Sequence, residues 1–138
     1  MASAPRAFIS FDFDHDETQR LLFAGQAKNS RTPFDISDWS SKQSLPQSQW
    51  ERLIEDKISR TNMLIVLVGR YMSSAGGVTK EIAMAQRNFV PTFGVYVNGA
   101  TSWSTLPSGL SPGRVIPWEW DAIALKIDQM MREGKNRF

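Results

Sequence analysis

One segment of the chain, NMLIVLVG at residues 62–69, is apolar at nearly every position. A strand with one face in water alternates apolar and polar residues, whereas a strand covered on both faces is apolar throughout. The segment is far shorter than the roughly 20 apolar residues that cross a bilayer. It therefore predicts the central strand of a parallel sheet enclosed by helices.

Strand and helix patterns alternate along the rest of the chain. Strands are predicted at residues 7–13, 31–37, 62–69, 90–99 and 114–118, and helices at 15–28, 44–58, 77–88 and 119–133. Pro33 suits an edge position for the second strand, because proline cannot donate a ladder hydrogen bond. This alternation favours a parallel sheet with helices on both faces. Ligands of such sheets bind at the carboxyl ends of the strands, near the switch in strand order.

Length and composition limit the classes of protein that remain. The 138 residues suit a single domain, residues 1–138, that buries about two-thirds of its unfolded surface. Lysines and arginines are scattered despite a formal charge of +2, so we expect no nucleic-acid surface. The absence of cysteine excludes disulfides and fits a reducing compartment. Without a signal-peptide core or a spanning segment, we expect a cytoplasmic protein with no membrane partner.

An acidic run, DFDHDE, follows the first predicted strand. A calcium loop would need glycine at its sixth position and glutamate at its twelfth, where the chain has Glu17 and Phe23. A phospho-receiver domain would need an aspartate after the third strand and a lysine after the fourth, and a flavodoxin would need a phosphate loop after the first. None of these is present. We therefore expect Asp14 and Asp16 to lie in a solvated loop, with Asp14 capping the next helix.

His15 is the single histidine of the chain. A lone histidine in an acidic loop is more often a surface group than a catalyst, so no Ser-His-Asp or Cys-His set is predicted. With one histidine and no cysteine, a zinc site would have to be built from carboxylates. We expect no metal site.

Glu81 lies in the first turns of the helix that follows the buried strand, within GGVTKEIAMAQ. It is predicted to lie on the flank of that helix's buried stripe, which consists of Val78, Ile82, Ala85 and Phe89. Partial burial raises a carboxyl pKa, whereas the helix N-terminus and Arg70 act in the opposite direction. Two interpretations remain open: a carboxylate that stabilises the helix dipole, and a catalytic acid or base at the expected ligand site.

Three blocks in this order resemble the TIR-domain superfamily, in particular the bacterial ThsB-type TIR-like branch of Thoeris antiphage defence. AFISFDF resembles the first strand and its loop, and PFDISDW the second strand and its loop, with Asp35 at the family's aspartate position. LIEDKISRTNMLIVLVGRY with VTKEIAMAQRNFVPTFGVYV resembles the third and fourth strand–helix units. The resemblance covers roughly residues 6–98. It implies a flavodoxin-like three-layer α/β sandwich whose five-stranded parallel sheet has the order 2-1-3-4-5.

The resemblance also implies an activity and a site. In catalytic members the glutamate in the KEI context acts on NAD, and this role carries over to Glu81. NAD is then the substrate, and no separate cofactor is implied. Cleavage of its nicotinamide–ribose bond passes through an oxocarbenium-like state that a carboxylate stabilises. The substrate-binding residues implied by the family are Phe8, Ser10, Phe11, Asp12, Phe13, Asp35, Trp39, Gly69, Arg70 and Tyr71.

One position departs from the family. Catalytic members usually carry a tryptophan four residues before the glutamate, where this chain has Gly77. Either Phe13 or Tyr71 replaces that aromatic surface, or the substrate differs, or activity is lost. The leading hypothesis is an enzyme that makes an ADP-ribose-derived, cyclic or transferred, signal nucleotide for a separate effector. The alternatives are a non-enzymatic TIR-like module acting through homotypic contacts, and a flavodoxin-like nucleotide-binding or deoxyribosyl-transferring protein. A homo-oligomer is a further expectation.

Overall fold

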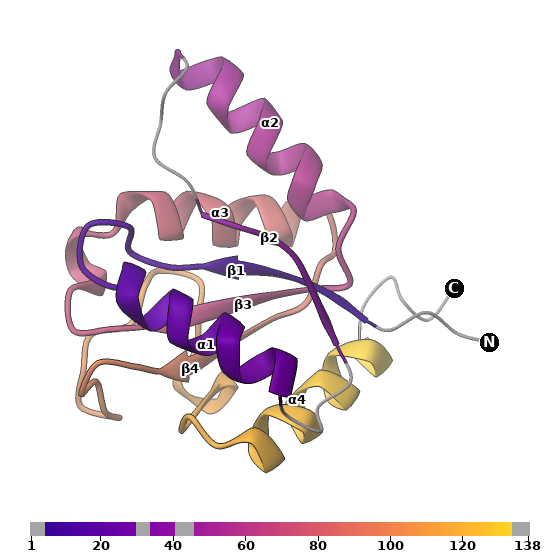
Figure 1. Ribbon diagram of the computed structural model, residues 1–138. Helices are drawn as coiled ribbons and strands as arrows, with labels where there is room; N and C mark the ends of the chain where they lie inside the picture. The colour runs from indigo at the N-terminus through magenta and orange to yellow at the C-terminus, as the bar shows by residue number, and fades with distance from the viewer. Residues whose placement is uncertain (1–4, 30–33, 41–45, 134–138) are drawn as a thin grey trace.

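The computed structural model describes residues 5–29, 34–40 and 46–133 and has three layers, with a parallel sheet between two pairs of helices (Figure 1). Its five strands follow the order β2-β1-β3-β4-β5. The strands are β1 (Arg6–Ser10), β2 (Asp35–Trp39), β3 (Met63–Val68), β4 (Thr92–Tyr96) and β5 (Val115–Ile116), and the helices are α1 (Glu17–Asn29), α2 (Gln47–Ser59), α3 (Gly76–Arg87) and α4 (Trp120–Glu133). This topology confirms the fold predicted from the sequence.

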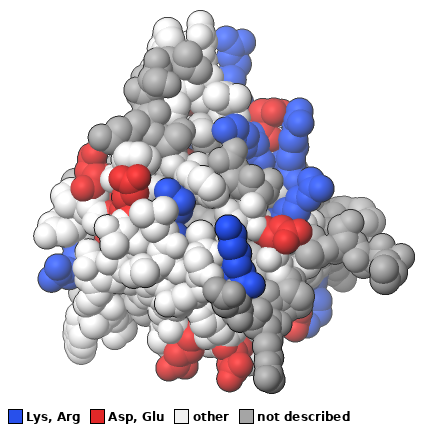
Figure 2. Space-filling view, in the orientation of Figure 1, with Lys and Arg blue, Asp and Glu red and all other residues white. Residues whose placement is uncertain are grey.

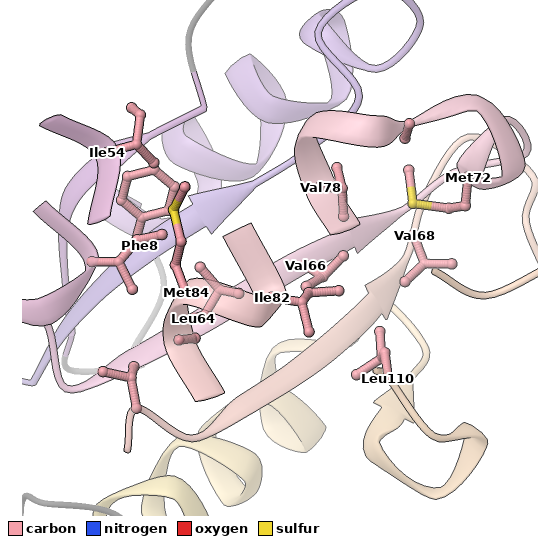
Figure 3. Close-up of a cluster of buried hydrophobic side chains, with 14 of the residues drawn as sticks. Phe8, Ile54, Leu64, Val66, Val68, Met72, Val78, Ile82, Met84 and Leu110 are labelled. Carbon is pink, nitrogen blue, oxygen red and sulfur yellow. The ribbon is translucent and has the colours of Figure 1, made fainter. Parts of the chain in front are cut away.

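The central strand β3 is buried at all six positions, as its unbroken apolar sequence predicts. Successive side chains of a strand point to opposite faces, so β3 supplies both halves of the core. Leu64, Val66 and Val68 pack with α2 and α3 on one face, as Figure 3 shows for the part around α3. Met63, Ile65 and Leu67 belong to the second cluster, which includes residues of α1 and α4. The sheet is therefore enclosed on both sides.

The second strand lies further along the chain than predicted. β2 pairs with β1 from Arg6 opposite Asp35 to Ile9 opposite Trp39. The backbone N–H of Ser40 then donates to the carbonyl of Ile9 at 2.9 Å, which extends the pairing beyond the strand. The sequence interpretation placed this strand at residues 31–37, of which 31–33 lie outside the described residues. The carboxyl end of β2 is consequently at Trp39 and Ser40.

Charged side chains of both signs are interspersed on the face shown in Figure 2, and uncharged residues cover most of it. Within the described ranges, no helix combines the length and the apolar character that crossing a membrane requires.

Candidate functional site

Glu81 lies inside the buried stripe of α3 and is 1% exposed. It follows Val78 by three residues and precedes Ala85 by four, so all three side chains share one helix face. The sequence interpretation, which placed Glu81 on the flank with partial burial, therefore underestimated its burial. The face that carries it packs against the sheet, where an ionised carboxylate needs polar partners.

Two serines from distant parts of the chain supply those partners. Ser10 Oγ donates to Oε1 of Glu81 at 2.7 Å, and Ser40 Oγ donates to the same oxygen at 2.5 Å. Ser10 is the last residue of β1 and points to the same face as Phe8, towards α3, because side chains alternate along a strand. Ser40 also accepts a hydrogen bond from the backbone N–H of Phe11 at 3.1 Å. The carboxyl ends of β1 and β2 thus converge on one carboxylate.

Burial raises the pKa of Glu81 from 4.5 to about 7, against the opposing effect of the hydrogen bonds from Ser40 and Ser10. Desolvation disfavours the charged form, whereas hydroxyl donors favour it. The carboxyl group therefore exchanges its proton much closer to neutral pH than an ordinary glutamate does. A pKa matched to the working pH is typical of acids and bases at functional sites.

A cavity of about 340 Å³ opens beside Glu81, which is within the usual size of small-molecule sites. The loop after β1 contributes one wall, where the rings of Phe11 and Phe13 stack with centroids 5.7 Å apart. The first turns of α2 and α3 contribute further lining residues. The lining residues are Phe11, Asp12, Phe13, Asp14, Ser40, Gln47, Trp50, Ala75, Gly76, Gly77, Val78, Lys80 and Glu81.

Asp12 lines the cavity and also contacts His15, whose ring stacks on Tyr71. Its carboxylate is 7% exposed, and its Oδ2 lies 2.6 Å from Nδ1 of His15. The imidazole of His15 in turn stacks on Tyr71, with centroids 4.0 Å apart and an angle of 19° between the rings. Tyr71 therefore reaches the cavity through His15 and Asp12 and does not line it.

Besides Tyr71, three further residues that the family resemblance assigns to the substrate lie away from the cavity. Phe8 is fully buried in the core, next to Met84 and Ile54 in Figure 3. Arg70 is exposed and its side chain lies beside Gly99. Neither residue lines the cavity.

Asp35, the third of these residues, lies at the amino end of β2. The strand rises about 3.3 Å per residue, so Asp35 is about 13 Å along the strand from Trp39. It therefore lies at the amino ends of the strands, whereas the cavity lies at their carboxyl ends. The expectation that Asp35 borders the site is corrected by the later position of β2. Trp39 does lie at the carboxyl end, is 38% exposed, and carries the guanidinium of Arg20 over its ring at 4.4 Å.

Gly69 has a packing role that the sequence does not indicate. A Cβ atom at this position would lie 2.1 Å from Oδ2 of Asp16, so the absent side chain makes room for that carboxylate. Asp16 is fully buried, which corrects its assignment to a solvated loop. Burial raises the pKa of Asp16, and a hydrogen bond from Asn98 at 3.3 Å opposes this effect.

Gly77 lines the cavity, and a Cβ atom there would meet nothing within 4 Å. The position could therefore hold a larger side chain. The Phe11 and Phe13 rings, which also line the cavity, provide an aromatic surface.

Sequence reasoning missed Ser40 and the residues of α2 that line the cavity. Ser40 was not recognised because the second strand was predicted to end at residue 37, which placed Ser40 in the loop after it. Gln47 and Trp50 come from a helix whose apolar stripe suggested only core packing. No group of three or more His, Cys, Asp or Glu residues suited to a metal ion occurs in the described part of the chain.

The comparisons with known proteins agree with the fold described above. The family described as Thoeris protein ThsB, TIR-like domain, matches residues 8–102, more than half of the chain. The chain belongs to this family. Membership of the Thoeris TIR-like family points to a part in bacterial antiphage defence.

A structural neighbour of this TIR-like domain is a prokaryotic SEFIR domain. The two superpose with a TM-score of 0.52 at 12% sequence identity, over 94% of this chain and 91% of the other. At this identity the likeness shows the fold alone. No curated protein matches the chain.

Proposed function

We propose that this TIR-like domain cleaves the nicotinamide–ribose bond of NAD and converts the ADP-ribose part into a signal nucleotide, by cyclisation or transfer. The nucleotide would activate a separate effector in antiphage defence. The observation that carries the proposal is Glu81, a buried carboxylate that borders a cavity and has a pKa of about 7. Membership of the TIR-like family supports NAD as the substrate class of this proposal.

The hydrogen bonds around Glu81 leave one oxygen for a ligand. Both serine hydroxyls donate to Oε1. No hydrogen bond from any part of the chain that the structure describes reaches Oε2. The ionised carboxylate can therefore stabilise positive charge as nicotinamide departs, and Oε2 can accept a ribose hydroxyl. Phe11 and Phe13 offer a face on which the nicotinamide ring would pack.

The test is mass spectrometry of NAD incubated with the purified protein, with Glu81→Gln as the variant and Glu119→Gln as a matched control. Glu119 is exposed, beyond β5, and does not line the cavity. We expect loss of NAD and a new ADP-ribose species in the wild type and in Glu119→Gln. In Glu81→Gln the rate should fall about 100-fold or more. The product mass would separate cyclisation, hydrolysis and transfer. Intact NAD in every sample, also with infected-cell lysate added, would refute the proposal.

Gly77 favours a second candidate, a non-enzymatic module that acts through homotypic contacts. Gly77 lines the cavity and has no side chain at the position where catalytic family members usually carry a tryptophan. If this candidate is right, Gly77→Trp should leave NAD intact, and substitutions at protomer contacts should abolish the biological response. If the enzyme is right, Gly77→Trp should fold normally and change the KM for NAD, because the new ring would enter the cavity.

A further inference from the structure

A second carboxylate, Asp12, reaches the cavity beside Glu81 and is held in place by its neighbours. The backbone N–H of Asp14 donates to Oδ1 at 3.1 Å, and Nδ1 of His15 lies 2.6 Å from Oδ2. With each oxygen engaged and the side chain 7% exposed, the carboxylate has little freedom to rotate. Asp12 therefore presents a fixed acceptor to whatever occupies the cavity.

His15 is itself held in place by a neighbouring ring. Its ring stacks on Tyr71 with centroids 4.0 Å apart, which sets the plane in which Nδ1 points to Asp12. His15 is 39% exposed and does not line the cavity. Any effect of His15 on a bound molecule is therefore transmitted through Asp12.

The two carboxylates have different surroundings, and this difference suggests different tasks. Glu81 accepts hydrogen bonds from two neutral hydroxyl groups, whereas Asp12 accepts one from a backbone N–H and contacts an imidazole. Cleavage of glycosidic bonds commonly divides the work between two carboxyl groups, one facing the developing positive charge and one handling a proton. We propose that Asp12 takes the proton of the attacking hydroxyl group or water, and that His15 is the residue that positions it.

The inference rests on the proposed NAD cleavage and completes its proton balance. The bond between the anomeric carbon and the nicotinamide nitrogen breaks, and nicotinamide leaves as a neutral molecule with the bonding electron pair. The oxygen of the attacking hydroxyl or water forms the new bond to the anomeric carbon. Its proton passes to the Asp12 carboxylate and then to solvent. No oxidant, reductant or metal ion is needed.

A purely structural role for Asp12 is the competing explanation. The hydrogen bond from Asp14 to Oδ1 closes a local turn, and such turns stabilise loops without any catalytic role. Asp12→Asn separates the two roles, because the amide oxygen can still accept the bond from Asp14 while the amide group cannot take a proton.

Two substitutions of His15 separate hydrogen bonding from ring stacking. His15→Phe keeps a ring to stack on Tyr71 but has no donor for Asp12. His15→Asn loses the ring but places an amide N–H close to the position of Nδ1. The control is Asp128→Asn, an exposed carboxylate on α4. For each protein, kcat and KM for formation of the ADP-ribose product are measured with NAD.

We expect kcat to fall at least about 100-fold in Asp12→Asn and at least about 10-fold in His15→Phe, with KM for NAD changed less than about threefold. His15→Asn should keep a kcat well above that of His15→Phe, and Asp128→Asn should match the wild type. The reverse order of the two His15 variants would show that stacking matters and would overturn the inference. So would a wild-type kcat in Asp12→Asn.

A second experiment separates failure of the proposed NAD cleavage from failure of the role proposed for Asp12. The chain has one histidine, so its imidazole produces a single set of NMR signals that needs no assignment by mutation. In Glu81→Gln, which binds NAD without turnover under the proposal, adding NAD should shift these signals through Asp12. If the wild type leaves NAD intact and the His15 signals do not move, both the proposed function and this inference fail. If the wild type cleaves NAD but Asp12→Asn and His15→Phe are unaffected, only this inference fails.

Discussion

Replacing Glu81 by glutamine should stabilise the folded protein at high pH, and under the proposed function it should also slow NAD cleavage. The carboxyl pKa is about 7 in the folded state, against an ordinary value of 4.5 in the unfolded chain. Each pKa unit corresponds to about 1.4 kcal/mol, so the difference amounts to about 3 kcal/mol. Glutamine has nearly the same shape, keeps an acceptor for Ser10 and Ser40, and never ionises. It removes the cost of holding a charge in the core.

The direction in which the free energy of unfolding changes with pH follows from the number of protons bound in the folded and unfolded states. Between pH 4.5 and about 7 the folded chain holds Glu81 protonated, while the unfolded chain has already released that proton. The folded state binds more protons, so the contribution of Glu81 to stability is complete below pH 4.5 and is lost as the pH rises through about 7. Above about pH 7 the folded wild type bears the full free-energy cost of a buried, ionised Glu81, whereas Glu81→Gln bears no such cost.

The assay is denaturant unfolding of both proteins from pH 5 to pH 8.5, with Glu119→Gln as the control. Titration of other groups, such as the ion pair of Arg87 with Glu55 and the buried Asp16, cancels in the difference between variant and wild type. The free energy of unfolding of Glu81→Gln relative to the wild type should rise by up to about 3 kcal/mol across the range, or about 10 °C in Tm at high pH. For Glu119→Gln the difference should stay flat. A rise smaller than about 1 kcal/mol for Glu81→Gln would refute the assigned burial and pKa.

Other predictions follow from the same geometry. If Glu81 acts when ionised, kcat/KM for NAD should rise with pH through about 7, and Ser40→Ala should move this transition upward by about one pH unit, since a donor to the charged form is lost. Gly69→Ala should cost about 1–3 kcal/mol in denaturant unfolding, because its Cβ would overlap the carboxylate of Asp16. Phe89 has a left-handed backbone with φ of 57° and is 79% exposed, so Phe89→Gly should raise the free energy of unfolding by about 1 kcal/mol. An unchanged or lowered stability of Phe89→Gly would contradict the assigned backbone strain.

The layers and the strand order could be predicted from the chain because hydrophobic periodicity is a local signal. The unbroken apolar run of β3 and the alternation of strands and helices depend only on near neighbours in sequence. The boundaries of β2 were harder to predict from the sequence, because its register is set by pairing with Arg6 and Ile9 of β1, which is distant in sequence. That error displaced Asp35 and concealed Ser40.

The site was predictable only in part for a similar reason. Glu81 could be singled out from its context, but its burial depends on Ser10 and Ser40, which compensate a charge that an apolar helix face would otherwise exclude. The fit of Asp16 against Gly69 likewise depends on a close approach between segments far apart in sequence. No local pattern encodes such contacts.

The hydrogen bonds of Glu81 also have a consequence for the newly made chain. They join residues that are 71 and 41 positions apart in sequence, and one partner follows the edge strand of the sheet. Closing such long loops is slow, and contacts of this kind form only when most of a parallel sheet is in place. An incompletely folded chain on the ribosome therefore lacks the assembled carboxylate site. Under the proposed NAD cleavage, the topology of the sheet would delay use of the cell's nucleotide pool until β1, the end of β2 and α3 have come together.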